Sequence, residues 1–274
     1  MSLRSAARWA AGVGGLGLVA VAAAQPPAGP IQPASYTPTA DVTQQVPAAK
    51  PADGAAALPR AVADARTAYA KVIDYTCHLV RQERVNGALR PEQTAELRVR
   101  TKPLAVNVKV IGPKAAAGEE TSYITGRHVG KVRHRGAGPE GGKAGFRTLA
   151  KDDPKALADT RHPVTEVGLL AVLDRVDKVV QTEKRLNHPV QVLTSGATIG
   201  GKPATKFEVF ADHPHAHRYA ARVVVYFDPA TKLPVRFEAY DSPKGAASAG
   251  DVLEVINFVG LRTNVGLADN AFER

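Results

Sequence analysis

The stretch of residues 95–110, AELRVRTKPLAVNVKV, decides the fold. Apolar and polar side chains alternate along both of its halves, and a lysine–proline pair at 102–103 separates the halves. Successive side chains of a strand point to opposite faces, so a period of two predicts two strands that each have one apolar face. The short connection between them predicts an antiparallel pair.

The same period continues through most of the chain. Asn86 and Gly87 suit the two-residue turn of a β-hairpin, because both residue types tolerate positive φ. Ten or eleven strands joined by short turns form one antiparallel sheet, since parallel pairing needs a crossover helix each time. Besides the stretch above, strands are predicted at 79–85, 121–125, 131–135, 146–150, 190–194, 206–212, 222–228, 233–241 and 251–261.

Two segments have a helical period instead. Apolar residues recur at spacings of three and four over residues 58–76, which predicts a first helix. A second helix is predicted to be capped by Thr165, to bury a stripe from Leu169 to Val180, and to end at 187–189. The predicted fold class is therefore α+β, with one large curved antiparallel sheet and two or more helices packed on it.

The first 57 residues follow neither period. Arg4 and Arg8 precede an apolar run that ends in three alanines at 22–24, the arrangement of an export signal cleaved after Ala24. An uncleaved membrane anchor is the alternative, although the run is shorter than the roughly 20 residues that span a bilayer. Residues 25–57 are rich in proline and poor in charge, which predicts an extended linker. Residues 58–274 then form a single domain, periplasmic or secreted.

The composition excludes several classes of protein. With 44% hydrophobic and 23% charged residues, the chain of 274 is neither wholly disordered nor a polytopic membrane protein. Its formal net charge of +10 suits anionic head groups, anionic glycans or an acidic partner, or serves only solubility. Export and an aromatic content of 5% argue against nucleic acid. The single cysteine, Cys77, excludes an internal disulfide and is predicted to be a buried, inert thiol.

No stretch has the form of a strong catalytic motif, and we expect neither an enzyme nor a cofactor. Residues 136–141 spell G-x-G-x-x-G, but proline and further glycines stand where a helix should begin, which predicts a flexible surface loop. His213, His215 and His217 alternate, so three imidazoles could converge on zinc or copper. A solvated polar loop is the alternative. The other histidines are isolated and are predicted to be structural or exposed: His78, His128, His134, His162 and His188.

The excess of apolar strand over helix raises the question of a cavity. Residues 223–227 are apolar on both faces, as are most of residues 252–259, and two helices can cover only part of so large a sheet. The sheet then either curls round a packed core or encloses an apolar cavity. The predicted lining, with the opposite strand faces left open as an alternative, is Val106, Val108, Val110, Val223, Val225 and Phe227.

Residues 74–87 resemble the opening of an exported bacterial family known only as domain of unknown function 1571, and residues 99–103, 162–168 and 236–241 resemble it too. More distantly, residues 227–236 and the ending at 264–272 are similar to the periplasmic lipoprotein carrier LolA and its receptor LolB. That likeness implies an incomplete barrel, closed by helices, whose apolar interior holds acyl chains.

Three hypotheses follow. The first is an exported, non-enzymatic carrier or sensor that binds lipid or an acylated lipoprotein, with basic residues steering anionic head groups, peripheral to the membrane at most. The second is an envelope interaction module with a basic face and no ligand cavity. The third is a metal-binding protein that uses His213, His215 and His217.

Overall fold

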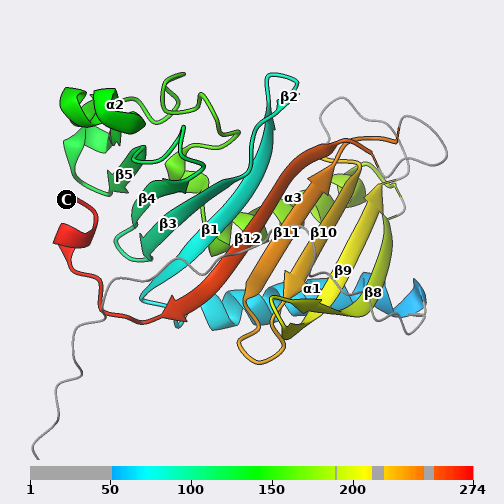
Figure 1. The fold of residues 1–274 in the computed structure, drawn as a ribbon. Coiled ribbons are helices and arrows are strands. Elements are labelled where there is room, and N and C mark those ends of the chain that lie inside the picture. The colour runs from blue at the N-terminus through cyan, green and yellow to red at the C-terminus, as the bar shows by residue number, and fades with distance from the viewer. Residues whose placement is uncertain (1–50, 189, 212–218, 244–249, 274) are drawn as a thin grey trace, which may run out of the picture. The chain divides into compact units, whose positions relative to one another are not determined.

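The structure, a computed structural model, describes residues 51–273 apart from 189, 212–218 and 244–249 (Figure 1). The predicted export signal, residues 1–24, lies outside this part of the chain, as do residues 25–50 of the predicted linker. His213, His215 and His217 also lie outside it, so the metal site stays a prediction.

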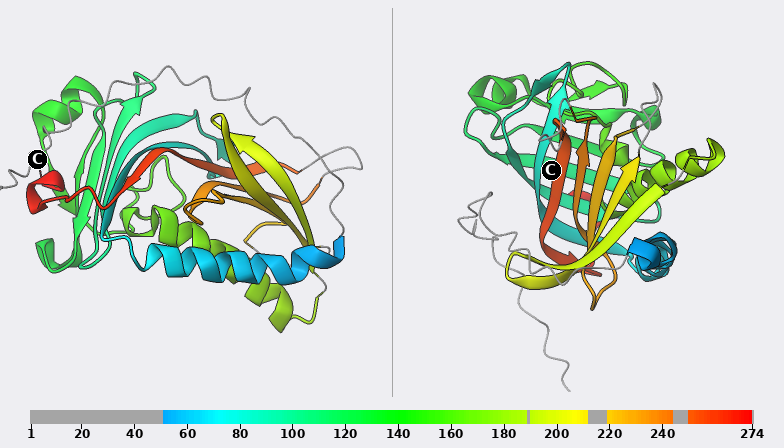
Figure 2. Two further views of the ribbon diagram at one scale, coloured as in Figure 1. Left: turned by 90° about the horizontal axis from the view of Figure 1, so that it is seen from below. Right: turned by 90° about the vertical axis from the view of Figure 1, so that its right-hand side faces the viewer.

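The described residues form one antiparallel sheet of twelve strands, accompanied by three α-helices. Eleven strands follow the order β7-β6-β5-β4-β3-β1-β12-β11-β10-β9-β8, and β2 pairs with β1. The sheet curves strongly into a half-barrel and does not close (Figure 2). The predicted α+β class is confirmed. The strands are β1 (Asp74–Val85), β2 (Ala88–Leu89), β3 (Gln93–Arg100), β4 (Ala105–Gly112), β5 (Glu120–Ile124), β6 (Val132–Arg135), β7 (Arg147–Leu149), β8 (Val190–Ile199), β9 (Lys202–Ala211), β10 (Arg222–Phe227), β11 (Pro234–Tyr240) and β12 (Val252–Thr263).

The first and last long strands join the two halves of the sheet. β1 pairs with β3 on one side, where Cys77 faces Leu97, and with β12 on the other, where Leu79 faces Phe258. Every other ladder of the main sheet connects strands that are neighbours in sequence. The pairing of β1 with β12 therefore holds the amino-terminal and carboxy-terminal halves together.

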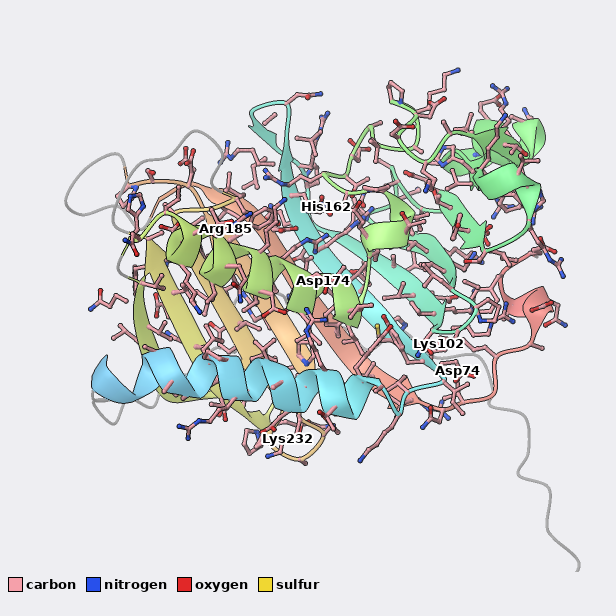
Figure 3. All side chains as sticks on the ribbon, turned by 180° about the vertical axis from the view of Figure 1, so that it is seen from behind. Asp74, Lys102, His162, Asp174, Arg185 and Lys232 are labelled. Carbon is pink, nitrogen blue, oxygen red and sulfur yellow. The ribbon has the colours of Figure 1, made fainter. Side chains whose placement is uncertain are left out.

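Two long helices cover the concave face of the sheet. They are α1 (Pro51–Tyr69) and α3 (Leu169–Arg185), which pack against each other (Figures 2 and 3). α1 contacts β8, and α3 contacts β8 and β11. The predicted stripe on the second helix is confirmed, since Leu169, Leu173 and Val176 are buried in the main core. None of the helices in the described residues is both long and apolar enough to cross a membrane.

The first helix differs from its prediction at both ends. α1 occupies 51–69, whereas the sequence analysis placed the helix at 58–76 and assigned residues 51–57 to the linker. The chain leaves the helix after Tyr69 because the following residues hydrogen-bond to segments at the ends of the strands instead. The hydroxyl of Thr101 donates to the carbonyls of Val72 and Ile73, and the Asp74 carboxylate accepts the backbone N–H groups of residues 265–267.

Two further expectations need correction. Thr165 does not cap α3; it lies in the 3-10 turn η2 (Val164–Glu166), and the helix begins at Leu169 behind Gly168. The glycine-rich stretch at 136–145, predicted to be a flexible surface loop, contains the short helix α2 (Gly138–Ala144). Pro139 lies in the first turn of this helix, a position that favours proline. The remaining 3-10 turns are η1 (His128–Gly130) and η3 (Asp269–Ala271).

The predicted hairpin turn at Asn86–Gly87 is confirmed. Both residues have positive φ, 52° and 79°, and Val85 pairs with Ala88 across the turn. Asparagine and glycine adopt this conformation at low cost, so the local sequence alone specifies the turn.

Candidate functional site

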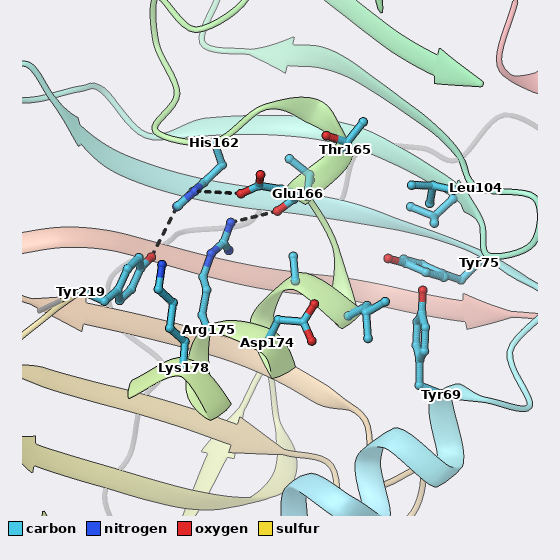
Figure 4. A pocket seen from close by; sticks show the side chains of 14 residues that line it. Tyr69, Tyr75, Leu104, His162, Thr165, Glu166, Asp174, Arg175, Lys178 and Tyr219 are labelled. Carbon is cyan, nitrogen blue, oxygen red and sulfur yellow. Dashed lines mark hydrogen bonds and ion pairs between the residues drawn. The ribbon is translucent and has the colours of Figure 1, made fainter. Parts of the chain in front are cut away.

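A cavity with a volume of about 440 Å³ opens on the concave side of the sheet (Figure 4). The carboxyl end of α1, η2 and the first turns of α3 surround it, and β1 and β3 form its floor. α1 and α3 contact β8 and β11, whereas η2 contacts β4 and β5. The floor between those two contact zones keeps an open space above it.

One wall of the cavity is apolar. Tyr75 on β1 and Val99 on β3 form the floor, and Tyr69 at the end of α1 stands beside them. Figure 4 shows Leu104 and the two tyrosine rings together on one side of the space. Burial raises the pKa of Tyr69 to about 12, so its phenol stays neutral at physiological pH. The apolar lining is completed by Leu104, Val167, Leu170 and Ala171.

Gly168 allows the start of α3 to approach Tyr75 closely. The Leu169 backbone N–H donates to the hydroxyl of Tyr75 at 3.0 Å, which ties the start of α3 to the floor. Gly168 has φ 113°, and a Cβ there would lie 2.2 Å from the Tyr75 hydroxyl oxygen. Only glycine allows both this backbone conformation and this close approach.

The opposite wall is charged. Arg175 and Lys178 on α3, His162 before η2 and Tyr219 before β10 line it (Figure 4). The Tyr219 hydroxyl lies 3.4 Å from His162 Nε2, and the two rings stack with centroids 6.3 Å apart. Arg175 donates to the Glu166 carbonyl at 2.9 Å. The cavity therefore has one apolar side and one charged, hydrogen-bonding side, whose lining also includes Glu166 and Asp174.

Glu254 lies behind the charged wall and is completely buried. Its carboxylate is 3.2 Å from His162 Nε2 and 4.0 Å from Arg175 Nε. Burial alone would raise the pKa of Glu254, but the close contact with His162 and the positive charges of Arg175 and Arg161 outweigh burial and lower the pKa below its usual value. The ionised carboxylate therefore holds the histidine and the arginine in position.

The exposed part of the lining forms the mouth of the cavity. Leu170, Asp174 and Lys178 of α3 line the cavity and are exposed, and Leu170 keeps 40% of its surface exposed. Arg66 of α1 donates to Asp174 at 2.7 Å and to Asp177 at 2.5 Å. These ion pairs connect the helices beside the opening.

The residues predicted to line a cavity are all buried on the face that the helices cover. Val223, Val225 and Phe227 on β10 belong to the main core, and so do Val106, Val108 and Val110 on β4. None of the six lines the large cavity; Val108 and Val110 border only a space of about 20 Å³. Strand alternation thus placed them on one face but did not locate the opening.

Sequence reasoning missed the residues that do line the cavity. His162 was interpreted as an isolated histidine, and the segment from His162 to Gly168 was used only for family likeness. In the sequence, this segment is marked only by a histidine six residues before the glycine at which a helix begins. Glu254, which contacts that histidine, is far away in sequence, so the contact could not be predicted. Cys77 is buried as predicted, and burial raises its pKa far above the usual value. Among the described residues no group of histidine, cysteine and carboxylate side chains could hold a metal ion.

The chain belongs to the protein family of unknown function DUF1571, whose model matches residues 72–274. No curated protein matches it. An uncharacterised conserved protein from Thermus thermophilus is 10% identical, with a TM-score of 0.46 over 80% of this chain and 93% of its own. Lipoprotein LppX from Mycobacterium tuberculosis is 12% identical, with a TM-score of 0.44 over 78% of this chain and 98% of its own. A LolA superfamily protein from Nitrosomonas europaea is 11% identical, with a TM-score of 0.29 over 79% of this chain and 97% of its own.

Proposed function

We propose that this protein is an exported, non-enzymatic carrier or sensor that binds an acyl-bearing amphiphile, a lipid or the acylated end of a lipoprotein, in the cavity beneath α3. The observation that carries the proposal is the polarity of the cavity, with an apolar wall opposite a charged wall that contains Arg175 and Lys178.

The size of the cavity supports a ligand of this kind. A volume of about 440 Å³ falls within the roughly 300–1,000 Å³ of small-molecule sites. The apolar wall around Tyr69, Tyr75 and Leu104 accepts methylene groups, each of which contributes about 0.8 kcal/mol on burial. A chain of several methylene groups would therefore bind without any covalent chemistry.

The charged wall supports an anionic or hydrogen-bonding head group. Arg175 offers a guanidinium that is fixed by the Glu166 carbonyl and faces Glu254. Lys178 is exposed at the mouth and Tyr219 offers a hydroxyl. A ligand carboxylate or phosphate at the mouth would meet Lys178 first and would keep its tail toward Tyr75.

A cavity-filling substitution tests the proposal. Ala171→Trp puts an indole into the cavity, and Ala63→Trp puts the same side chain on the exposed face of α1 as a control. Binding of a fluorescent fatty acid to the delipidated whole chain should fall at least tenfold in the first variant and stay unchanged in the second. Equal binding by both folded variants would remove the cavity as the binding site.

A charge substitution at the mouth tests the head-group end without touching the core. Lys178→Glu should weaken binding of a fatty acid and leave binding of the uncharged monoacylglycerol nearly unchanged. Lys184→Glu, an exposed lysine further along α3, is the control. A protein isolated natively without co-purifying lipid, and unable to bind either probe, would instead support an interaction module with no ligand.

Export is tested at the amino terminus. Cleavage after Ala24 gives a mature chain that begins at Gln25, so sequencing of the protein isolated from its envelope fraction should begin there. A chain that still begins at residue 1 would support the uncleaved anchor.

A further inference from the structure

One edge of the half-barrel brings together turns that are far apart in sequence. Because the strands alternate in direction, the connections α1–β1, β3–β4, β5–β6 and β10–β11 all lie at the same edge as the end of β12. Asp74, Lys102 and Lys232 follow the lower boundary of the molecule in Figure 3. We call this the basic edge and define it as residues 70–73, 101–104, 125–131, 228–233 and 264–266.

Three large apolar side chains at the basic edge face solvent. Ile73 is 65% exposed, Val129 is 96% exposed and Val265 is 37% exposed. Val129 stands at the tip of the β5–β6 turn with φ 53°, a left-handed conformation that costs energy for a β-branched residue. Leu89, by contrast, is 39% exposed at the opposite edge.

The charges at the basic edge are mostly unopposed. Lys71, Lys102, Lys131 and Lys232 are exposed, and none of them forms an ion pair among the described residues. Two of the nearby acids already pair with cations: Asp269 binds Arg100 and Arg127, and Glu273 binds Arg127 and His128. Asp228 accepts the N–H groups of Ala230 and Thr231 in its own turn and is the one acid of the edge segments.

From this arrangement the structure assigns the basic edge as a docking surface for an anionic lipid bilayer. Ile73, Val129 and Val265 enter the interface, and the lysines contact the lipid head groups. Apolar side chains at turn tips, interleaved with lysine, suit a membrane surface, where burial of apolar groups and attraction to anionic lipid act together. A protein partner would favour a continuous apolar centre, and here lysines separate the apolar groups.

The apolar wall of the cavity lies next to this edge. Leu104, two residues after Lys102, lines the cavity, and its carbonyl accepts the N–H of Thr125 at the start of the β5–β6 connection. Tyr69, another lining residue, immediately precedes the α1–β1 connection. Docking would bring this apolar wall close to the bilayer. A carrier docked in this way could exchange lipid with the membrane. That exchange rests on the proposed function, whereas docking itself does not.

Site-specific labelling of the whole chain tests the docking. Val129→Cys and Leu89→Cys variants are labelled with an environment-sensitive iodoacetamide dye; the native Cys77 is buried and its raised pKa keeps the thiol protonated. With vesicles of phosphatidylglycerol and phosphatidylcholine, dye at 129 should shift to the blue and be quenched by a lipid-borne quencher. Dye at 89 should do neither. Equal responses at both positions, or none at 129, would overturn the proposal.

The lysines provide a second measurement in the same labelled background. Lys102→Gln with Lys131→Gln should raise the vesicle concentration for half-maximal shift roughly 25-fold, about fivefold for each lysine removed. The exposed control pair Lys114→Gln with Lys155→Gln, outside the basic edge, should change it little. No difference between the two pairs would overturn the electrostatic part, and a response to envelope protein without any to vesicles would overturn the choice of a bilayer.

The two proposals fail separately. Fatty-acid binding without vesicles should be unchanged in the Lys102 and Lys131 variant, because neither side chain lines the cavity. Loss of docking with intact fatty-acid binding would remove only the docking proposal. Normal dye insertion in a protein that binds no acyl ligand would remove only the carrier proposal.

Discussion

The two halves of the concave face differ in how the helices fill them. Over β8 to β11, α1 and α3 pack directly on the strands, and residues such as Val225 and Phe237 are completely buried. Over β1 and β3, the helices have ended or only begun, and a cavity of about 440 Å³ remains. Both halves carry the same alternation of apolar residues, so helix placement decides whether an apolar strand face becomes packed core or cavity wall.

The largest expected effect is a truncation in the packed half. Phe237→Ala removes a ring that is completely buried between the sheet and the helices, and should lower the free energy of unfolding by about 4 kcal/mol. Leu104→Ala in the cavity wall should cost about 1 kcal/mol, because that side chain is only partly buried. Urea unfolding of both variants measures the difference. Equal losses would mean that the two halves are packed alike.

Glu254→Gln tests the charged wall. The substitution leaves His162 and Arg175 without their buried carboxylate and should cost about 3 kcal/mol at pH 7. Because the pKa of Glu254 is lowered from 4.5, the stability from its charge is complete above about pH 4.5 and disappears as the pH falls through the lowered pKa.

The loss of stability between neutral pH and pH 3 should therefore be smaller in Glu254→Gln than in the native protein. Chemical denaturation at several pH values measures both curves. Parallel curves would contradict an ionised Glu254, and Glu238→Gln is a control carboxylate on the neighbouring strand β11.

Gly168→Ala tests the close contact between the start of α3 and Tyr75 on β1. The new methyl group would approach the Tyr75 hydroxyl at 2.2 Å, in a backbone conformation with φ 113°, so we expect a loss of about 2 kcal/mol. Removing the hydroxyl with Tyr75→Phe should recover part of that loss. A double-mutant cycle on thermal or urea stability measures the coupling, and strictly additive losses would show that the contact is not the cause.

The smallest expected effect is at the ion pairs between the helices. Arg66→Ala removes the contacts with Asp174 and Asp177, which are largely open to solvent, and should cost less than about 1 kcal/mol. The same substitution should speed the release of a bound fluorescent fatty acid, because the pairs lie beside the mouth. Stopped-flow dissociation measures this, and a rate equal to the native one would mean that the helices do not limit release.

Local chemistry made much of the fold predictable. Asn86–Gly87 specifies its turn through positive φ, and the alternation at 95–110 specifies which side chains share a face. The stripe on α3 follows from the helical period. The end of α1 was misjudged because Val72 and Ile73 continue an apolar pattern that suits either helix or strand, and the choice depends on Thr101 and Asn264, which hydrogen-bond to them beside the ends of the strands.

The candidate site was less predictable. The six valine and phenylalanine positions were chosen by strand face, and all six are buried in the main core. The lining of the observed cavity depends on where α1 ends and α3 begins, and on the contact of His162 with Glu254 across the half-barrel.

By itself, then, the sequence determined the class of fold, the apolar face of each strand and the excess of basic residues, because alternation and charge are properties of neighbouring residues. Only the tertiary structure decided that a cavity lies over β1 and β3, that a histidine and a glutamate 92 residues apart share its charged wall, and that four distant turns form one basic edge. Those features arise from the pairing of β1 with β12 and from the positions of two helix ends, which no local pattern encodes.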